Sequence, residues 1–445
     1  MTLRARPHET EGPALRNSQP DETTRGIPAA CDGVSFIAPS QASRPLRVLS
    51  VFGTRPEAIK MAPVIKALSG NPRIVSRVCV TAQHRRLLDQ VLAHFSIHPD
   101  HDLDVMTPDQ TSAQVASRVL SRLEPVIREE RPDWVLVQGD TTSTLAAALA
   151  ASYGGTKLAH VEAGLRSFDI RQPFPEEHNR RLVSGLADLH FAPTEVARAN
   201  LLREGIEPQR ILVTGNTGID ALYQTLGELD RLDNGDEKPW DPLPIGRRVI
   251  LATVHRHENL GPVFEEICHA LSTIATRFRD DVYFVCPLHP RREVQVTAHG
   301  LLGHCPNIRL LEPLGYLHLV GLLRSCDMVV TDSGGLQEEA PPLGKPVLVL
   351  RNVTERPEGL AAGSARLAGT RAKGIIREAS RILQDRGLYA QMARPSEPYG
   401  DGHAAQRIVS ALLEQPQNVQ PIAAATSASR DNAVYVARDP GRVSA

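Results

Sequence analysis

The sequence has few aromatic residues and no excess of charge of either sign. Phe, Trp and Tyr make up 4% of its 445 residues, and 50 Lys and Arg stand against 51 Asp and Glu. Sparse aromatics argue against a base-stacking platform for single-stranded nucleic acid. Balanced charge gives no long-range attraction to nucleic acid or to an anionic membrane. We therefore expect no nucleic-acid partner, and any bound anion must be held by individually placed Arg and Lys side chains.

Long hydrophobic runs, paired cysteines and a dinucleotide fingerprint are also missing. No stretch approaches the roughly 18 apolar residues that span a bilayer, and the first residues lack the apolar segment of a secretory signal. The six cysteines show no CxxC pair, which is typical of reduced thiols in a cytoplasmic protein. The pattern GxGxxG is absent, so bound NAD is not supported. We expect a cytoplasmic protein with no membrane partner, no metal and no cofactor.

The folded part alternates short β-branched strands with helical segments. A chain of 445 residues is too long for one ordinary core. Strands that are apolar throughout, each followed by a helix, predict parallel sheets covered on both faces. The alternation restarts after a polar stretch from Asp230 to Pro244 that is rich in Gly and Pro. The fold class is therefore α/β, with two Rossmann-like doubly wound domains facing a central cleft.

The same patterns suggest limits for these parts. Residues near Gly215 to Gly218 are expected to lie between the two domains as a hinge. The predicted parts are a disordered extension (1–45), an N-terminal Rossmann-like domain (46–215), a C-terminal Rossmann-like domain (216–395), a helical segment packing back on the first domain (396–414) and a disordered tail (415–445).

The most informative segment is 328–340, MVVTDSGGLQEEA. A β-branched strand ends at Asp332, breaks at Ser333-Gly334-Gly335 and opens a helix. Unpaired N–H groups at a helix start favour an anion, and glycine lets a phosphate approach the backbone closely. Glu338 or Glu339, one turn later, could accept hydrogen bonds from two ribose hydroxyls. The segment therefore predicts a site for a ribose carrying a diphosphate.

Polar side chains also follow other predicted strands. Each has an ordinary explanation: Asp140 suits a helix N-cap, Glu176 suits a first helical turn, and a single His is more often structural. Together they fall on one predicted sheet edge, where they would supply cations, acids and an imidazole. These residues are Arg55 and Lys60 after the first strand, Asp140, Glu162, Glu176, His255 and Arg356.

Several long motifs resemble those of the non-hydrolysing UDP-N-acetylglucosamine 2-epimerases. They are GTRPEAIKMAP, QGDTTSTLAAALAA, HVEAGLRS, PEEHNRRLV, TGNTGIDAL, TDSGGLQEEAP and VTERPE, and the match runs from about Arg47 to Leu412. The resemblance implies the GT-B arrangement, a homodimer and interconversion of UDP-GlcNAc and UDP-ManNAc. It also implies roles for particular residues. The catalytic candidates are Asp140, Glu162, Glu176, His255 and Lys60. The candidates for binding the UDP-sugar are Arg55, Lys60, Asp140, Glu162, His255, Ser333, Gly334, Gly335, Glu339 and Arg356.

The resemblance further implies a mechanism and a regulatory segment. UDP would leave C1 as the C2 proton is removed, and a bound 2-acetamidoglucal would be reprotonated on its other face. Gln83, His84 and Arg86 occupy the segment that forms an allosteric pocket in relatives, with Arg86 in place of a Gln. The alternatives are epimerisation of a 3-acetamido or uronic acid UDP-sugar, a hydrolysing epimerase that releases ManNAc, a GT-B glycosyltransferase and a silent nucleotide-sugar sensor.

Overall fold

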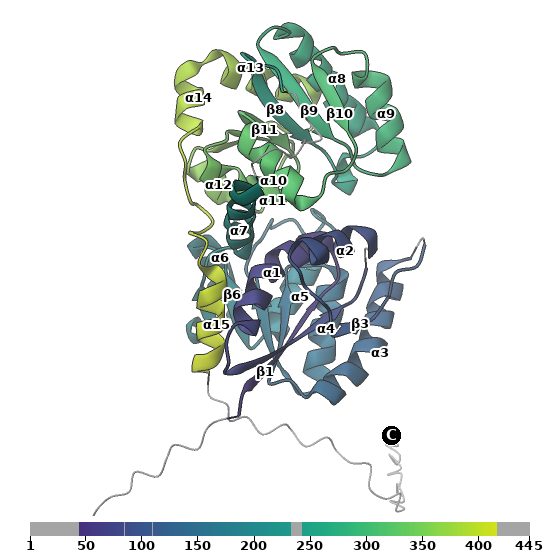
Figure 1. Cartoon of the computed structure of the whole chain (residues 1–445), viewed down its shortest axis with the longest axis vertical. Helices are drawn as coiled ribbons and strands as arrows, with labels where there is room; N and C mark the ends of the chain where they lie inside the picture. The colour runs from purple at the N-terminus through teal and green to yellow at the C-terminus, as the bar shows by residue number, and fades with distance from the viewer. Residues whose placement is uncertain (1–43, 84, 109, 233–242, 416–445) are drawn as a thin grey trace, which may run out of the picture. The chain divides into compact units, whose positions relative to one another are not determined.

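The computed structural model describes residues 44–83, 85–108, 110–232 and 243–415, and these form two parallel sheets with helices packed around them (Figure 1). The predicted extension and tail lie outside the described residues, apart from a few at their inner ends. The α/β class predicted from the apolar strands is confirmed.

The first sheet has seven strands in the order β3-β2-β1-β4-β5-β6-β7. Its strands are β1 (Leu46–Phe52), β2 (Ile74–Val80), β3 (His101–Asp102), β4 (Trp134–Gln138), β5 (Lys157–Val161), β6 (Leu189–Ala192) and β7 (Ile211–Val213). The helices between and after them are α1 (Arg55–Ser69), α2 (Arg85–His94), α3 (Ser112–Glu130), α4 (Thr142–Tyr153), α5 (Glu176–Leu186), α6 (Glu195–Arg203) and α7 (Thr217–Leu232).

The second sheet has six strands in the order β10-β9-β8-β11-β12-β13. Its strands are β8 (Arg248–Thr253), β9 (Val282–Pro287), β10 (Ile308–Leu311), β11 (Met328–Thr331), β12 (Val347–Val349) and β13 (Ala365–Leu367). The α-helices that follow are α8 (Pro262–Arg277), α9 (Arg292–Leu302), α10 (Tyr316–Ser325), α11 (Gly334–Glu339), α12 (Pro357–Ala361), α13 (Ala372–Gln384), α14 (Arg386–Met392) and α15 (Ala404–Glu414).

Strand order reverses at the centre of each sheet. The first strand of each half pairs in parallel with both of its neighbours, β1 with β2 and β4, and β8 with β9 and β11. In doubly wound sheets, ligands bind beyond the carboxyl ends of the strands at this reversal. The loops after β1, β4, β8 and β11 are therefore where a site is expected, and the predicted polar residues lie in or beside them.

Three details differ from the sequence prediction. The edge strands β3 and β13 were not predicted, because β3 consists of two polar residues and Arg366 interrupts the three residues of β13. The polar stretch from Asp230 begins inside α7, which ends at Leu232, and residues 233–242 lie outside the described residues.

The last described helix returns to the first sheet's helices. α15 packs against α1, and its start is fixed by Asp220 of α7, which accepts hydrogen bonds from Ala404 N (3.2 Å) and Ala405 N (2.9 Å). The predicted domain boundaries at residues 215 and 395 stay a prediction.

Candidate active site

A buried carboxylate ties together the two central loops of the first sheet. Glu57, in the first turn of α1, is 2% exposed. Its Oε2 accepts from the backbone N–H groups of Gly53 (2.9 Å) and Thr54 (2.7 Å). Its Oε1 accepts from the hydroxyls of Thr141 (2.6 Å) and Thr144 (2.7 Å), which follow β4. These four bonds fix the loops that carry Arg55 and Asp140.

A second buried carboxylate, that of Asp332, ties together the two central loops of the second sheet. Asp332, directly after β11, is fully buried. Its carboxylate accepts from the backbone N–H of His255 (3.1 Å) and Arg256 (2.9 Å) and from Asn259 Nδ2 (3.0 Å), in the loop after β8. The His255 side chain is 42% exposed, with Nδ1 3.3 Å from Asp332 Oδ1. Asp332 therefore holds the loop that presents His255.

Cations and acids from both sheets meet in one buried cluster. Lys60 Nζ of α1 lies 2.5 Å from Glu162 Oε1, after β5, and 3.0 Å from Glu338 Oε2 of α11. Arg356, at the start of α12, donates its Nε to Glu338 (2.6 Å) and lies 3.5 Å from Glu162. Each charge is thus paired, as buried charges must be. The contacts bring predicted residues of the first sheet against predicted residues of the second.

Opposing influences act on the acids of this cluster. Burial raises the pKa of Glu162. The charge of Lys60 lowers this pKa, and the charge of Glu338 raises it further. Burial would also raise the pKa of Glu338, but Arg356 and Lys60 hold it below its usual value. Glu162 has φ +65°, a left-handed conformation that is uncommon for a non-glycine residue and is often found at functional sites.

Ser333, Gly334 and Gly335 form the start of α11, and packing requires a glycine at position 334. Ser333 caps α11, and its Oγ accepts from Leu336 N at 3.5 Å. A Cβ on Gly334 would lie 2.5 Å from Cζ of Arg356, whereas the nearest atom to a Cβ on Gly335 is Ser333 Oγ at 3.8 Å. The guanidinium of Arg356 therefore lies directly against the turn, which places a cation at the predicted diphosphate position.

Glu339 lies in a separate environment from Glu338. Tyr316 of α10 donates its hydroxyl to Glu339 Oε1 (3.0 Å) in the buried interior. Burial raises the pKa of Glu339 to about 7, and the neighbouring Glu338 contributes to the increase. Burial lowers the pKa of Arg55, against the attraction of Glu339. Of the two acids considered for the ribose, Glu338 is occupied by Lys60 and Arg356, and Glu339 is the one beside Arg55.

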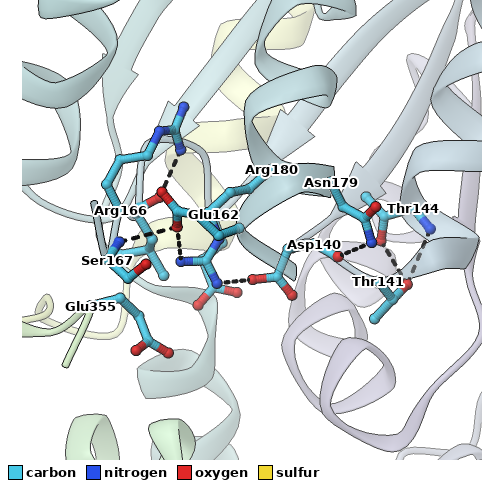
Figure 2. A network of polar contacts seen from close by, with 12 residues as sticks. Asp140, Thr141, Thr144, Glu162, Arg166, Ser167, Asn179, Arg180 and Glu355 are labelled. Carbon is cyan, nitrogen blue, oxygen red and sulfur yellow. Dashed lines mark hydrogen bonds and ion pairs between the residues drawn. The ribbon is translucent and has the colours of Figure 1, made fainter. Parts of the chain in front are cut away.

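Asp140 and Glu176 lie close to each other at the rim of the first sheet. Arg180 of α5 donates Nη2 to Asp140 Oδ2, and Asn179 Nδ2 donates to the Asp140 carbonyl at 2.8 Å (Figure 2). Glu176 is the first residue of the same helix. Burial raises the pKa of Glu176, and the charge of Asp140 raises it further.

The candidate allosteric residues are only partly described. Gln83 accepts from Ser143 Oγ at 2.8 Å, and the side chain of Arg86 is exposed on α2. His84 lies outside the described residues. The allosteric role of Gln83, His84 and Arg86 stays a prediction.

Sequence reasoning missed several residues of this site. Glu338 was considered only as an alternative for the ribose, although two adjacent acids beside Gly-Gly could have suggested two roles. Arg180 stands inside the motif PEEHNRRLV, but its spacing gives no sign of its contact with Asp140. Tyr316 lies in no quoted motif. Glu355 stands inside VTERPE, but nothing in the motif shows that it lies between Arg351 (2.7 Å) and Arg356 (2.5 Å).

Among the described residues, no helix is long and apolar enough to cross a membrane. Within those same ranges, no group of three or more His, Cys, Asp and Glu side chains is arranged to hold a metal ion. The five described cysteines are buried free thiols, and Cys31 lies outside that part of the chain.

Comparison with known proteins assigns the family. The sequence model of the family described as UDP-N-acetylglucosamine 2-epimerase matches residues 66–413. The UDP-N-acetylglucosamine 2-epimerase of Escherichia coli strain K12 is 49% identical over 370 residues, covering 82% of this chain and 98% of that protein. The chain belongs to the UDP-N-acetylglucosamine 2-epimerase family.

Solved structures of this family and of a glycosyltransferase support the fold assignment. A UDP-GlcNAc 2-epimerase from Neisseria meningitidis, bound to UDP-GlcNAc, matches with a TM-score of 0.81 at 45% identity, over 83% of this chain and 100% of that one. The glycosyltransferase SnogD from Streptomyces nogalater matches with a TM-score of 0.50 at 21% identity, over 83% of this chain and 100% of its own, and shows the fold alone. The predicted GT-B fold of this epimerase-family chain is confirmed.

Proposed function

We propose that the chain is a non-hydrolysing epimerase that interconverts UDP-GlcNAc and UDP-ManNAc. The observation that carries this proposal is the meeting of Lys60 and Glu162 from the first half with Glu338 and Arg356 from the second. The Neisseria structure was solved with UDP-GlcNAc, and this chain shares 45% identity with it. The cluster supplies cations suited to a diphosphate and acids suited to proton transfer.

The diphosphate would bind where Arg356 lies against the Ser333-Gly334-Gly335 turn, with Arg55 and Lys60 reaching it from α1. The ribose hydroxyls would bind Glu339. UDP would displace some of the internal ion pairs, because Lys60 and Arg356 are shared between carboxylates in the structure described here. The cations would then stabilise the negative charge that develops on the leaving diphosphate.

The reaction would proceed by elimination and return. The bond between C1 and the UDP oxygen breaks, and UDP leaves with the electron pair. A carboxylate removes the C2 proton, so that a C1–C2 double bond forms in a 2-acetamidoglucal. A proton then returns to C2 on the opposite face, and the UDP oxygen re-forms its bond to C1. Asp140, Glu162 and Glu176 are the acid and base candidates, and His255 is proposed to contact the substrate beside them.

Further properties belong to the same proposal. The two Rossmann-like domains would span 46–215 and 216–395, with 396–414 packing on the first, and the protein would be a cytoplasmic homodimer. Its product would supply ManNAc-type sugars for cell-surface polysaccharide. Gln83, His84 and Arg86 would lie in an allosteric segment, where the family resemblance implies that Arg86 changes or removes activation by substrate.

A substrate panel followed by proton NMR tests the proposal. The purified chain is incubated with UDP-GlcNAc and with its 3-acetamido and uronic acid counterparts. We expect UDP-GlcNAc to equilibrate with UDP-ManNAc while the sugar stays attached to UDP. Release of free ManNAc and UDP would indicate a hydrolysing epimerase, and turnover of a modified sugar alone would replace the substrate. Transfer of GlcNAc to an added acceptor would indicate a glycosyltransferase, whereas binding without turnover would indicate a sensor.

A further inference from the structure

We infer that Arg180 is a positioning residue that holds the carboxylate of Asp140 for proton transfer. The inference rests on the proposed epimerase function and adds a residue to it. Arg180 lies in the second turn of α5, and its side chain is 4% exposed. Its Nη2 donates to Asp140 Oδ2, the interaction drawn at the centre of Figure 2. A guanidinium at a carboxylate restricts both its position and its rotation.

A second carboxylate, that of Glu177, fixes the side chain of Arg180. Its Nη1 donates to Oε2 of Glu177 at 3.1 Å. Glu177 is fully buried and also accepts from Ser167 N (3.1 Å) and Arg181 Nε (3.2 Å). The planar guanidinium therefore spans two carboxylates, one structural and one in the candidate site. A lysine at this position could not reproduce the span, because its ammonium is a single point of charge.

The neighbouring residue of α5 fixes the backbone of Asp140. Asn179 Nδ2 donates to the Asp140 carbonyl oxygen at 2.8 Å. Adjacent residues of one helix thus hold both the main chain and the side chain of Asp140, and the same helix begins with Glu176. The relative placement of Asp140 and Glu176 is consequently set within a single rigid element.

This arrangement gives the two carboxylates different environments. Asp140 faces the buried guanidinium of Arg180. Burial raises the pKa of Glu176, with the charge of Asp140 adding to the shift, which favours its protonated form. Carboxylates whose surroundings differ in this way commonly divide the acid and base roles. An Asp140 carboxylate fixed by Arg180 suits removal of the C2 proton, and Glu176 at the start of the same helix suits its return.

The test compares Arg180→Lys with Arg181→Lys in the full chain. Arg181 binds the same Glu177 but has no contact with Asp140, and its side chain is 39% exposed, so it is a matched control. We expect Arg180→Lys to lower kcat on the order of 10²-fold, the cost typical of a small misplacement of a reacting group. Its UDP affinity by calorimetry and its thermal unfolding should stay close to wild type. Arg181→Lys should keep kcat within about twofold of wild type, as expected for a surface change.

A double-mutant cycle with Asp140→Asn separates positioning from other effects. If Arg180 acts through Asp140, adding Arg180→Lys to Asp140→Asn should cost much less than it does in wild type. An undiminished cost in the Asp140→Asn background would overturn the inference. So would normal kcat in Arg180→Lys, or its failure to fold or to bind UDP, because α5 rather than Asp140 would then depend on Arg180. A wild-type chain that epimerises no UDP-sugar would instead refute the proposed function.

Discussion

The reversal points of the two sheets use the same internal support but expose different chemistry. In the first sheet Glu57 links the loop after β1 to the loop after β4, and in the second Asp332 links the loop after β8 to the end of β11. Both carboxylates are buried and accept hydrogen bonds from backbone N–H groups. Each doubly wound half therefore fixes its two central loops through one acid, before any ligand is considered.

The side chains presented beyond these loops differ. The first half contributes the acids Asp140, Glu162 and Glu176, with Arg180 behind them. The second half contributes the glycine turn of α11 with Arg356 lying against Gly334. The comparison suggests that the first half supplies the acids for proton transfer, whereas the second half, together with Arg55 and Lys60 of α1, holds the leaving group. Substitutions in the two halves should therefore affect different kinetic quantities.

The largest expected effect belongs to the acids of the first half. Asp140→Asn, Glu162→Gln and Glu176→Gln should each lower turnover by about 10²–10⁴-fold, the usual contribution of general acid–base catalysis. UDP affinity, measured by calorimetry, should change far less. If all three variants kept near-normal turnover, the acid and base groups would lie elsewhere.

Substitutions in the glycine turn of the second half should lower UDP affinity more than they lower turnover. Gly334→Ala places a Cβ 2.5 Å from Cζ of Arg356. Such overpacking typically lowers the free energy of unfolding by about 1–3 kcal/mol. UDP affinity should fall by a comparable amount because Arg356 must move. In Gly335→Ala the new Cβ lies 3.8 Å from its nearest neighbour, Ser333 Oγ, so stability and UDP affinity should fall less than in Gly334→Ala. Equal UDP affinities for the two variants would remove Arg356 from the diphosphate position.

Substitution of Glu339 tests the proposed binding of the ribose hydroxyls by the second half. Glu339→Ala should weaken UDP binding by about 1–3 kcal/mol, the cost of losing a charged hydrogen-bond partner. Uridine should lose a similar amount, because the contact is to the ribose and not to the phosphates. Calorimetry that finds unchanged UDP affinity would exclude Glu339 from the site.

The pH dependence of UDP binding gives the smallest and most specific effect. Burial raises the pKa of Glu339 to about 7, so its ionised form, which accepts two ribose hydroxyls, becomes populated as pH rises. UDP affinity should therefore increase from pH 6 to pH 8, by up to about tenfold for one proton released on binding. Glu339→Gln should lose this component, and the variant also corrects for titration of UDP itself.

The same raised pKa affects stability with a definite sign. Between the usual pKa of the carboxyl and about 7, the folded state binds more protons at Glu339 than the unfolded state does. The free energy of unfolding should therefore fall as pH rises through this window. Denaturant titrations of wild type and Glu339→Gln should differ in this slope, and identical slopes would contradict the raised pKa.

The fold was predictable because its strands are short, mostly apolar runs such as Trp134–Gln138, each followed by a helical segment, a pattern typical of a parallel sheet covered on both faces. The edge strands β3 and β13 escaped prediction because they lack an apolar run: β3 is His101-Asp102, and Arg366 interrupts Ala365–Leu367. Residues immediately after strands, such as Asp140 and the Ser333-Gly335 turn, were also predictable, since parallel strands bring their ends to one edge.

The partners of those residues were not predictable in the same way. Arg180 reaches Asp140 across 40 positions of sequence, and Lys60 meets Glu338 across the two halves. Such pairs depend on how separate elements pack, which local periodicity does not encode. The unequal environments of Glu338 and Glu339 likewise arise from side chains of other elements, Arg356 and Tyr316.

The most direct test of the account is the fate of the C2 hydrogen and of the C1–O bond during epimerisation. UDP-GlcNAc carrying 18-oxygen in the bridge between C1 and phosphorus is incubated with the chain in D₂O. Elimination and return predict deuterium at C2 of the product and movement of the label into non-bridging phosphate positions, since both bonds break in the elimination. Epimerised product that retained its original C2 hydrogen and kept the label in the bridge would contradict it.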